Sequence, residues 1–177
     1  MKTVPFLTNP VLADAVIQTL ASDLLTLAWL EYVYPIAETG INDEDKTYPY
    51  VYAEDGTSEY YGLYPDDDVK AFSFFTNNGF QIGEPGYLNT YNFSLYVWCR
   101  LDKIQTNNND FTMSLVNDCV IKLRENECFG LYVEMKDPFA EFTAFDYHEN
   151  SMLMRKRSGF RIDFSIYGDN DICESEL

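Results

Sequence analysis

Residues 90–104 read TYNFSLYVWCRLDKI, and an alternating pattern within this stretch decides the fold. Apolar residues recur at every second position, which is the period of a β-strand with one face toward a core. The set expected to face the core comprises Phe93, Leu95, Val97, Cys99 and Leu101. The intervening set includes Tyr96, Trp98 and Arg100, which are residue types enriched in protein interfaces. We therefore predict that this second face of the strand binds another protein.

Three further segments are predicted to form strands. Residues 71–75 are apolar and precede a stretch with the turn signals Asn77-Asn78-Gly79 and Glu84-Pro85-Gly86. Residues 129–135 and 160–166 repeat the alternation of apolar and other residues. These segments, together with the strand over 93–101, predict a largely antiparallel sheet.

Two segments have a helical period instead. Asn9 followed by Pro10 is typical of a helix cap with proline in the first turn, and apolar residues then recur at helical spacing as far as Pro35. This predicts a helix of about 22 residues, ~33 Å long. A second apolar stripe runs over 111–124 and ends with Lys122 and Arg124, which suit the negative end of a helix dipole.

The segment 38–68 combines carboxylates with aromatic residues. It contains ten acidic residues and a single basic one, Lys46, and tyrosines lie on both sides of the turn signal Asp55-Gly56. We predict a projecting hairpin. Because burial suits tyrosine and disfavours carboxylate, we expect this hairpin to present an interface. The residues assigned to that interface are Tyr48, Tyr50, Tyr52, Tyr60, Tyr61, Tyr64, Asp66, Asp67 and Asp68.

The order of elements predicts one α+β domain over residues 1–177, in which two helices pack on the sheet. With 177 residues, 46% of them apolar, the chain is long enough to form a core without disulfides or metals. The hairpin over about 38–68 is an excursion from this domain, and about 168–177 forms an acidic tail.

The net charge of −17 excludes several functions. It repels DNA phosphates and anionic lipid, so we expect neither nucleic-acid nor membrane binding. The opening MKTVPFLTNP lacks the regions of a signal peptide, and the apolar run from Val11 to Val33 is interrupted by Asp14, Gln18 and Asp23. We therefore expect neither export nor a membrane span.

Motifs for catalysis or cofactor binding are missing from the sequence. His148 is the single histidine, no phosphate-binding glycine loop occurs, and the clusters 43–45 and 66–68 lack the ligand spacing of a calcium-binding loop. The four cysteines form no CxxC pair, which favours reduced, buried thiols in a cytosolic protein. We expect no enzymatic activity, no cofactor and no metal.

Basic residues gather at Arg155, Lys156 and Arg157, far along the chain from the acidic segment. Identical copies that carry one acidic and one basic surface can meet head to tail, and such contacts can close into a ring. We therefore add these three residues to the predicted interface.

Several segments together resemble tail-terminator and neck-ring proteins of tailed bacteriophages. The composition, rich in Asn, Tyr and Asp, also resembles that of phages of gut Bacteroidetes, including the crAss-like group. The segments are NPVLADAVIQTLASDLLTLAWLEYVYPIA (9–37), YPYVYAEDG (48–56), YYGLYPDDD (60–68), TYNFSLYVWCRLDKI (90–104), FTMSLVNDCVIKLREN (111–126) and GFRIDFSIYG (159–168).

The resemblance implies a hexameric or dodecameric ring in the neck or tail of the virion, made in the host cytoplasm. It implies contacts with portal, neck or tail proteins, a channel through which double-stranded DNA passes without specific binding, and no enzymatic activity. The acidic segment 38–68 is longer than a minimal terminator needs, which leaves terminator, connector and accessory ring as alternatives. Two other functions remain open: an acidic inhibitor that mimics DNA and binds a basic host protein, and a metal-dependent hydrolase.

Overall fold

The computed structural model describes residues 12–53, 59–66, 68–83, 88–104, 111–145 and 157–168. In chain order, the elements are α1 (Leu12–Leu24), β1 (Tyr32–Ile36), β2 (Glu38–Ile41), β3 (Thr47–Ala53), β4 (Glu59–Gly62), β5 (Ala71–Gln81), β6 (Asn89–Arg100), α2 (Phe111–Glu125), β7 (Phe129–Glu134), the 3₁₀ helix η1 (Thr143–Phe145) and β8 (Arg157–Gly168). The predicted α+β class with mostly antiparallel sheet is confirmed.

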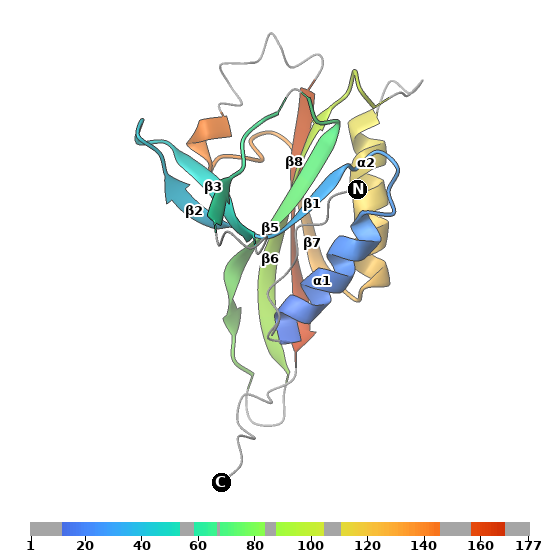
Figure 1. The fold of residues 1–177 in the computed structure, drawn as a ribbon. Coiled ribbons are helices and arrows are strands. Elements are labelled where there is room, and N and C mark those ends of the chain that lie inside the picture. Colours follow the sequence, from blue (N-terminus) through green and yellow to red (C-terminus); the bar gives the residue numbers. More distant parts are fainter. Residues whose placement is uncertain are drawn as a thin grey trace.

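A five-stranded sheet in the order β1-β5-β6-β8-β7 forms the centre of the molecule (Figure 1). The edge strand β1 is parallel to β5, and the other neighbours are antiparallel. The strand predicted over 93–101 is confirmed as β6, which pairs with β8 along its whole length from Asn89↔Gly168 to Arg100↔Arg157. Its long, uninterrupted pairing explains why the sequence signal is clearest here.

Both helices cover one face of this sheet (Figure 1) and bury its main core. Each helix presents one apolar stripe to the sheet. Two hydrogen bonds connect each helix to the turn that follows the other. The Trp29 indole N–H, after α1, donates to Asp118 on α2 at 3.0 Å, and the Asn126 amide, after α2, donates to Asp23 on α1 at 2.8 Å. The core residues include Ile17, Leu20, Leu24, Leu115, Cys119, Leu123, Phe75, Phe93, Leu95, Val97, Phe160, Ile162, Phe164 and Ile166.

The predicted length of the first helix is wrong, because α1 ends at Leu24. Backbone bonds from Thr26 to Asp23 and from Leu27 to Leu24 turn the chain, and residues 32–36 then form β1 beside β5. Tyr and Val favour strands, and proline is tolerated on an edge strand because its missing N–H can face away from the sheet. The apolar spacing continues past the end of the helix because later residues are buried in the same core. Leu30 reaches this core from the connection after α1, and Val33 reaches it from β1. Asn9 and Pro10 lie outside the described residues.

The second sheet has three strands in the order β2-β3-β4 and lies over the other side of the molecule (Figure 1). Pairing of β3 with β4, including Val51↔Tyr61, confirms the predicted hairpin, and its turn Asp55-Gly56 lies outside the described residues. The sequence interpretation missed β2, which pairs with β3 from Glu38↔Tyr50 to Ile41↔Thr47.

Strand β5 is longer than predicted. It continues from Ala71 through Asn77 and Asn78 to Gln81, with an irregularity in its pairing to β6 between Asn77 and Phe80. Gly79 adopts a φ of 91°, a conformation that glycine reaches without steric cost. The turn signals in this stretch therefore mark a bulge inside a strand rather than its end.

Candidate functional site

The second face of β6 is buried, contrary to the prediction that it is free to bind another protein. Tyr96 is 0% exposed and Trp98 is 2% exposed. They pack in a second core, made largely of aromatic residues, between the five-stranded sheet, the three-stranded sheet and η1. Tyr96 and Trp98 therefore stabilise the fold. Their prediction as interface residues is wrong, because neither side chain reaches the surface. The aromatic members of this core are Phe72, Phe74, Tyr96, Trp98, Phe139, Phe142 and Phe145.

Stacking within this core follows the geometry that aromatic pairs prefer. The side chains of Phe74 and Tyr96 lie parallel on neighbouring strands, with centroids 4.9 Å apart. Phe142 meets both of them edge to face, at 5.6 Å and 5.2 Å. The segment that carries Phe142 is thereby fixed on the sheet. Sequence reasoning missed this segment because residues 137–145 have neither a helical nor a strand period.

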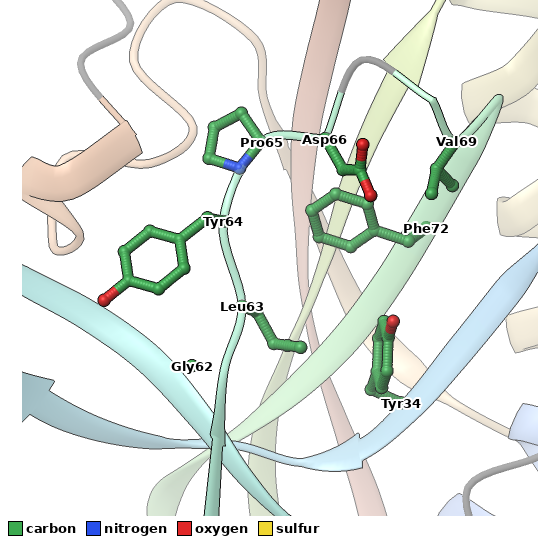
Figure 2. A pocket seen from close by; sticks show the side chains of 8 residues that line it. All are labelled: Tyr34, Gly62, Leu63, Tyr64, Pro65, Asp66, Val69 and Phe72. Atoms are coloured by element: carbon green, nitrogen blue, oxygen red, sulfur yellow. The ribbon is translucent and has the colours of Figure 1, made fainter.

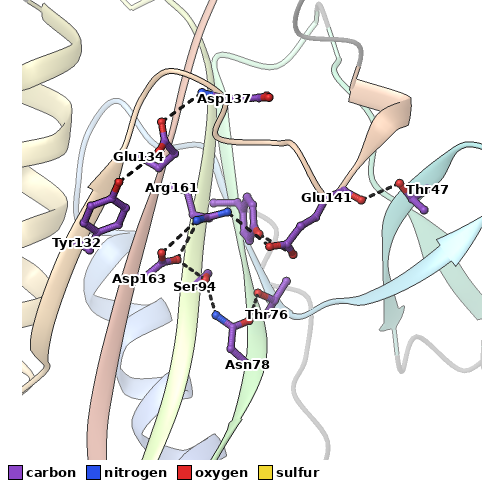
Figure 3. A network of polar contacts seen from close by, with 11 residues as sticks. Thr47, Thr76, Asn78, Ser94, Tyr132, Glu134, Asp137, Glu141, Arg161 and Asp163 are labelled. Carbon is purple, nitrogen blue, oxygen red and sulfur yellow. Dashed lines mark hydrogen bonds and ion pairs between the residues drawn. The ribbon is translucent and has the colours of Figure 1, made fainter.

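A polar network lies beside the aromatic core (Figure 3). Arg161 on β8 pairs with Asp163 at 2.9 Å and reaches Glu141 at 3.5 Å. Asp163 also accepts a hydrogen bond from the Ser94 hydroxyl at 2.5 Å, and Ser94 accepts one from the Asn78 amide at 2.7 Å. The network links three adjacent strands to the segment 137–145, and the buried hydroxyl of Ser94 is satisfied within it.

The three-stranded sheet is tied to the same segment. The Thr47 hydroxyl donates to the Glu141 carbonyl at 2.7 Å, and the backbone N–H groups of Thr47 and Thr143 each donate to the other's hydroxyl at 2.9 Å. These contacts join residues that are 94 to 96 positions apart in the chain. The position of the acidic segment is therefore fixed at its base by η1 and its surroundings.

Tyrosines cover the outer face of the three-stranded sheet. Tyr48 stacks on Tyr64 with centroids 5.3 Å apart, and the Tyr50 hydroxyl donates to Glu38 at 2.9 Å. A β-carbon at Gly62 would lie 2.7 Å from the Tyr64 side chain and 2.9 Å from that of Tyr48. The glycine thus lets the aromatic side chains lie flat over the neighbouring strand, which produces a partly exposed tyrosine face.

A pocket of about 510 Å³ opens where the chain leaves β4 and approaches β5. Figure 2 shows Tyr34 and Phe72 on one side of the segment that carries Leu63, with the Asp66 carboxylate above Phe72 in that view. Phe72 and Leu63 are buried, whereas Asp66 is exposed at the rim. We call this cavity the Tyr34 pocket; its lining comprises Tyr34, Gly62, Leu63, Tyr64, Pro65, Asp66, Val69 and Phe72.

The electrostatic environment of the Tyr34 pocket is negative. Burial is the main cause that raises the pKa of the Tyr34 phenol above 10.0, and Tyr32, Asp66 and Glu31 raise it further. The Asp66 carboxylate is oriented by the backbone two residues further on, since its Oδ1 accepts a hydrogen bond from the Asp68 N–H at 2.8 Å. The pocket therefore combines apolar walls with a fixed negative charge at its mouth.

The other predicted interface residues are distributed as follows. Tyr61, Asp66 and Asp68 are exposed, while Asp67, Arg155 and Lys156 lie outside the described residues. Tyr52 and Tyr60 form a backbone pair between β3 and β4. The remaining two are Arg100, which pairs with Asp102 at 2.8 Å, and Arg157.

Arg100 and Arg157 are paired residues on β6 and β8, and the Arg100 N–H donates to the Lys70 carbonyl at 2.7 Å. Arg157 and the segment leading from Asp68 into β5 thus lie at the same end of the five-stranded sheet.

The described residues also bear on reactive thiols, metal sites and membrane-spanning helices. Cys99, Cys119 and Cys128 are free and buried, which confirms the expectation for these three thiols. Among the described residues, no group of three or more His, Cys, Asp or Glu side chains is arranged to hold a metal ion. No helix in the described ranges has the length and apolar character needed to cross a membrane.

Comparisons with known proteins give no similarity on which to base a function. The chain matches no family model, no curated protein and no solved structure.

Proposed function

We propose that the protein is a structural subunit of an oligomeric ring in the neck or tail of a tailed bacteriophage. The proposal combines the resemblance of its segments to tail-terminator and neck-ring proteins with the geometry of the three-stranded sheet. In this reading, the protein binds its own copies and adjoining portal, neck or tail proteins. It has no enzymatic activity and no cofactor.

The observation that carries the proposal is the open edge of β2. Within the described residues, β2 pairs with β3 alone, and Figure 1 shows it at the outer limit of the molecule. Ile41 on this strand is 69% exposed. An open edge strand presents unpaired backbone groups to a strand of another chain, and many complexes form by adding such a strand.

The tyrosine face adjoins this edge. Tyr48 and Tyr50 lie on β3 opposite Gly40 and Glu38 of β2, so a chain added along β2 would border both aromatic residues. Tyrosine contributes a large apolar area and a hydroxyl that can form hydrogen bonds, and it is enriched at interfaces for this reason. Backbone pairing along β2 and side-chain contacts on the tyrosine face thus favour the same subunit contact.

The overall charge fits a channel for DNA. Each subunit contributes a net charge of −17, and a channel lined by such subunits repels the phosphate backbone. Double-stranded DNA then passes without being bound. Attraction between neighbouring subunits must come from local contacts, because the net charges repel one another.

The test is the mass of the protein in solution and its presence in particles. We expect mass photometry at micromolar concentration, with and without the neighbouring virion proteins, to give species of six or twelve times the 20.5 kDa subunit. Mass spectrometry of purified virions should detect the protein at a fixed ratio to the portal protein. A persistent 20.5 kDa monomer under both conditions, together with its absence from particles, contradicts the proposal.

A further inference from the structure

We propose that the tyrosine face, formed by Tyr48, Tyr50 and Tyr64, binds a proline-rich segment of another protein that carries basic residues beside its prolines. The inference goes beyond the proposed function, because it names a ligand that a single subunit binds whether or not it forms a ring. Its basis is an aromatic surface that two glycines hold flat, in an acidic part of the chain.

Gly40 and Gly62 let the tyrosine side chains lie close to the backbone of the three-stranded sheet. A β-carbon at Gly40 would lie 2.9 Å from Cζ of Tyr48 and 3.0 Å from Cδ1 of Tyr50. A β-carbon at Gly62 would lie 2.9 Å from Cε2 of Tyr48. The Tyr48 side chain therefore contacts both neighbouring strands, β2 and β4. It lies across the sheet, whereas strand side chains ordinarily stand upright on it.

Further contacts hold the three tyrosines in this arrangement. Tyr64 is nearly parallel to Tyr48, with an angle of 19° between them, and Tyr50 is inclined to Tyr48 by 53°. The Tyr50 hydroxyl donates to Glu38, and Tyr64 forms a hydrogen bond with Asn42. A ligand therefore meets side chains that are already ordered, which lowers the entropic cost of binding.

The outer side of this aromatic layer is accessible. Tyr64 is 44% exposed, and Tyr48 and Tyr50 are half-buried. Figure 2 shows the Tyr64 side chain pointing away from Leu63, which is buried in the aromatic core on the inner side of the sheet. The three tyrosines thus form one continuous surface, and contiguous exposed apolar surface is typical of binding sites.

The chemistry of this surface matches a polyproline II segment. The phenol hydroxyls of Tyr48 and Tyr64 can donate to the carbonyl groups that a polyproline II backbone leaves unpaired. Proline supplies apolar surface and has no N–H that needs a partner. The centroid separations of 5.3 Å and 6.3 Å are close to the ~6 Å that two residues of this helix span, so one turn contacts two tyrosines. Aromatic surfaces bind proline-rich segments in this way in several recognition domains.

Charge selects basic residues beside the prolines. Lys46 is the single basic residue of the segment 38–68, and it pairs with Glu44 at 3.4 Å. The surface is therefore rich in acceptors for the N–H groups of arginine or lysine, and it repels an acidic partner. The exposed carboxylates of the three-stranded sheet and its connections are Glu38, Asp43, Glu44, Asp45 and Asp66.

The experiment titrates synthetic peptides into the full-length protein and follows binding by two-dimensional NMR. The probe is a short oligoproline with an arginine at each end, and the matched control keeps both arginines but replaces the prolines by alternating glycine and serine. We expect saturable shifts at Gly40, Tyr48 and Tyr64 with the probe, and at least about tenfold weaker binding of the control. Equal binding of both peptides overturns the role of proline, and the absence of saturable shifts with the probe overturns the site.

The location is tested with Tyr64→Leu, which removes the aromatic side chain and keeps an apolar one. This variant should bind the probe about tenfold more weakly, because tyrosines commonly dominate the affinity of an interface. The matched control is Tyr167→Leu, at a 58% exposed tyrosine on β8 of the other sheet, which should bind as the natural sequence does. Unchanged binding in a folded Tyr64→Leu variant overturns the proposal. The comparison of peptides on the natural sequence needs no variant.

The charge is tested with Glu38→Gln, which keeps an oxygen that can accept from the Tyr50 hydroxyl. It should weaken binding of the probe about threefold at low salt and leave an oligoproline with glutamine at each end unaffected. Equal losses for both peptides overturn the selection of basic residues.

The same titration separates this site from the proposed ring. Failure of the protein to form rings contradicts the proposed function alone, because the peptide binds a single subunit. Shifts at Tyr48 and Tyr64 that grow with protein concentration, without any response to the probe, identify a second copy as the occupant and overturn the proline-rich ligand.

Discussion

The Tyr96 hydroxyl donates a hydrogen bond of 3.1 Å to the Glu141 carboxylate, although 45 residues separate the two in sequence. Arg161 lies 6.0 Å from the centre of the Tyr96 side chain and contacts the same carboxylate. Burial, and then the charge of Glu141, raise the pKa of the Tyr96 phenol above 10.0. The hydrogen bond joins β6 to the segment 137–145 that covers it. The aromatic core therefore depends on a polar group, the Glu141 carboxylate, at its edge.

Replacing Arg161 by alanine should destabilise the fold. The Arg161 side chain compensates the negative charges of Asp163 and Glu141. Without it, Asp163 keeps its hydrogen bond from the buried Ser94 hydroxyl but loses the positive charge that neutralises it. We expect the free energy of unfolding to fall by about 2 kcal/mol, the range for losing a hydrogen bond to a partly buried charge. Urea unfolding at pH 7 measures this change.

The control for Arg161 is Lys122→Ala. Lys122 forms an exposed pair with Glu125 at 2.9 Å, and such surface pairs contribute less than about 0.5 kcal/mol. Equal effects of the two substitutions would show that the network around Arg161 does not hold the segment 137–145 in place.

The two tryptophans should differ in their access to solvent. Trp98 is 2% exposed inside the aromatic core, whereas Trp29 is only partly buried. In the Trp29→Phe variant, which leaves Trp98 as the single tryptophan, fluorescence should be weakly quenched by acrylamide. In Trp98→Phe, the remaining Trp29 should be quenched more strongly. The reverse order would restore the sequence-based prediction that Trp98 lies on an open face.

The buried thiols should be unreactive in the folded protein. Burial raises the pKa of Cys99 and Cys128 from 9.0 to about 12 and raises that of Cys119 as well. In a Cys173→Ser variant at pH 8, a thiol reagent should label none of the three until denaturant is added, because the thiolate is the reactive form. Labelling of native protein at the rate of free cysteine contradicts the buried environment.

The same thiols predict a loss of stability in alkali. The folded state keeps the thiol protons that the unfolded state releases above pH 9.0, so the stabilisation is complete below pH 9.0 and declines as the pH rises toward 12. The urea midpoint should fall over this window. Cys128→Ala, which lacks one shifted thiol, should show a shallower fall.

Reversing the basic cluster should prevent assembly without unfolding the subunit. In the proposed ring, the variant Arg155→Glu, Lys156→Glu, Arg157→Glu removes the positive charge that we expect to attract the acidic segment of a neighbouring copy. Circular dichroism and the melting temperature should stay close to those of the natural sequence, while mass photometry shows a monomer. Assembly that survives the triple reversal would show that another surface joins the subunits.

Local patterns were enough to predict the elements that are regular over their whole length. The alternation in β6 and β8 and the stripe of α2 were identified correctly, because each buries one continuous face against a single core. The pairing of β3 with β4 also followed from tyrosines on both sides of a turn signal. By contrast, the alternation of Tyr32 and Tyr34 before Pro35 was a strand signal that the longer apolar run concealed.

The candidate site combines residues that only the fold brings together. The acidic segment supplied Tyr64 and Asp66 to the Tyr34 pocket, but Tyr34 and Phe72 come from two other strands. Sequence periodicity also cannot show how many faces of a strand are covered. Tyr96 and Trp98 are residues typical of interfaces, and they are buried because an irregular segment from elsewhere in the chain packs over them.

The sequence by itself determined the α+β class, the central strand pair, the second helix and the acidic, tyrosine-rich character of the segment 38–68, since each depends on the order of neighbouring residues. Only the tertiary structure decided where α1 ends, that β2 and β1 are edge strands, and that both faces of β6 are buried. The physical reason is that burial depends on contacts between distant segments, such as Glu141 with Tyr96, and these contacts leave no periodic signal in the residues that make them.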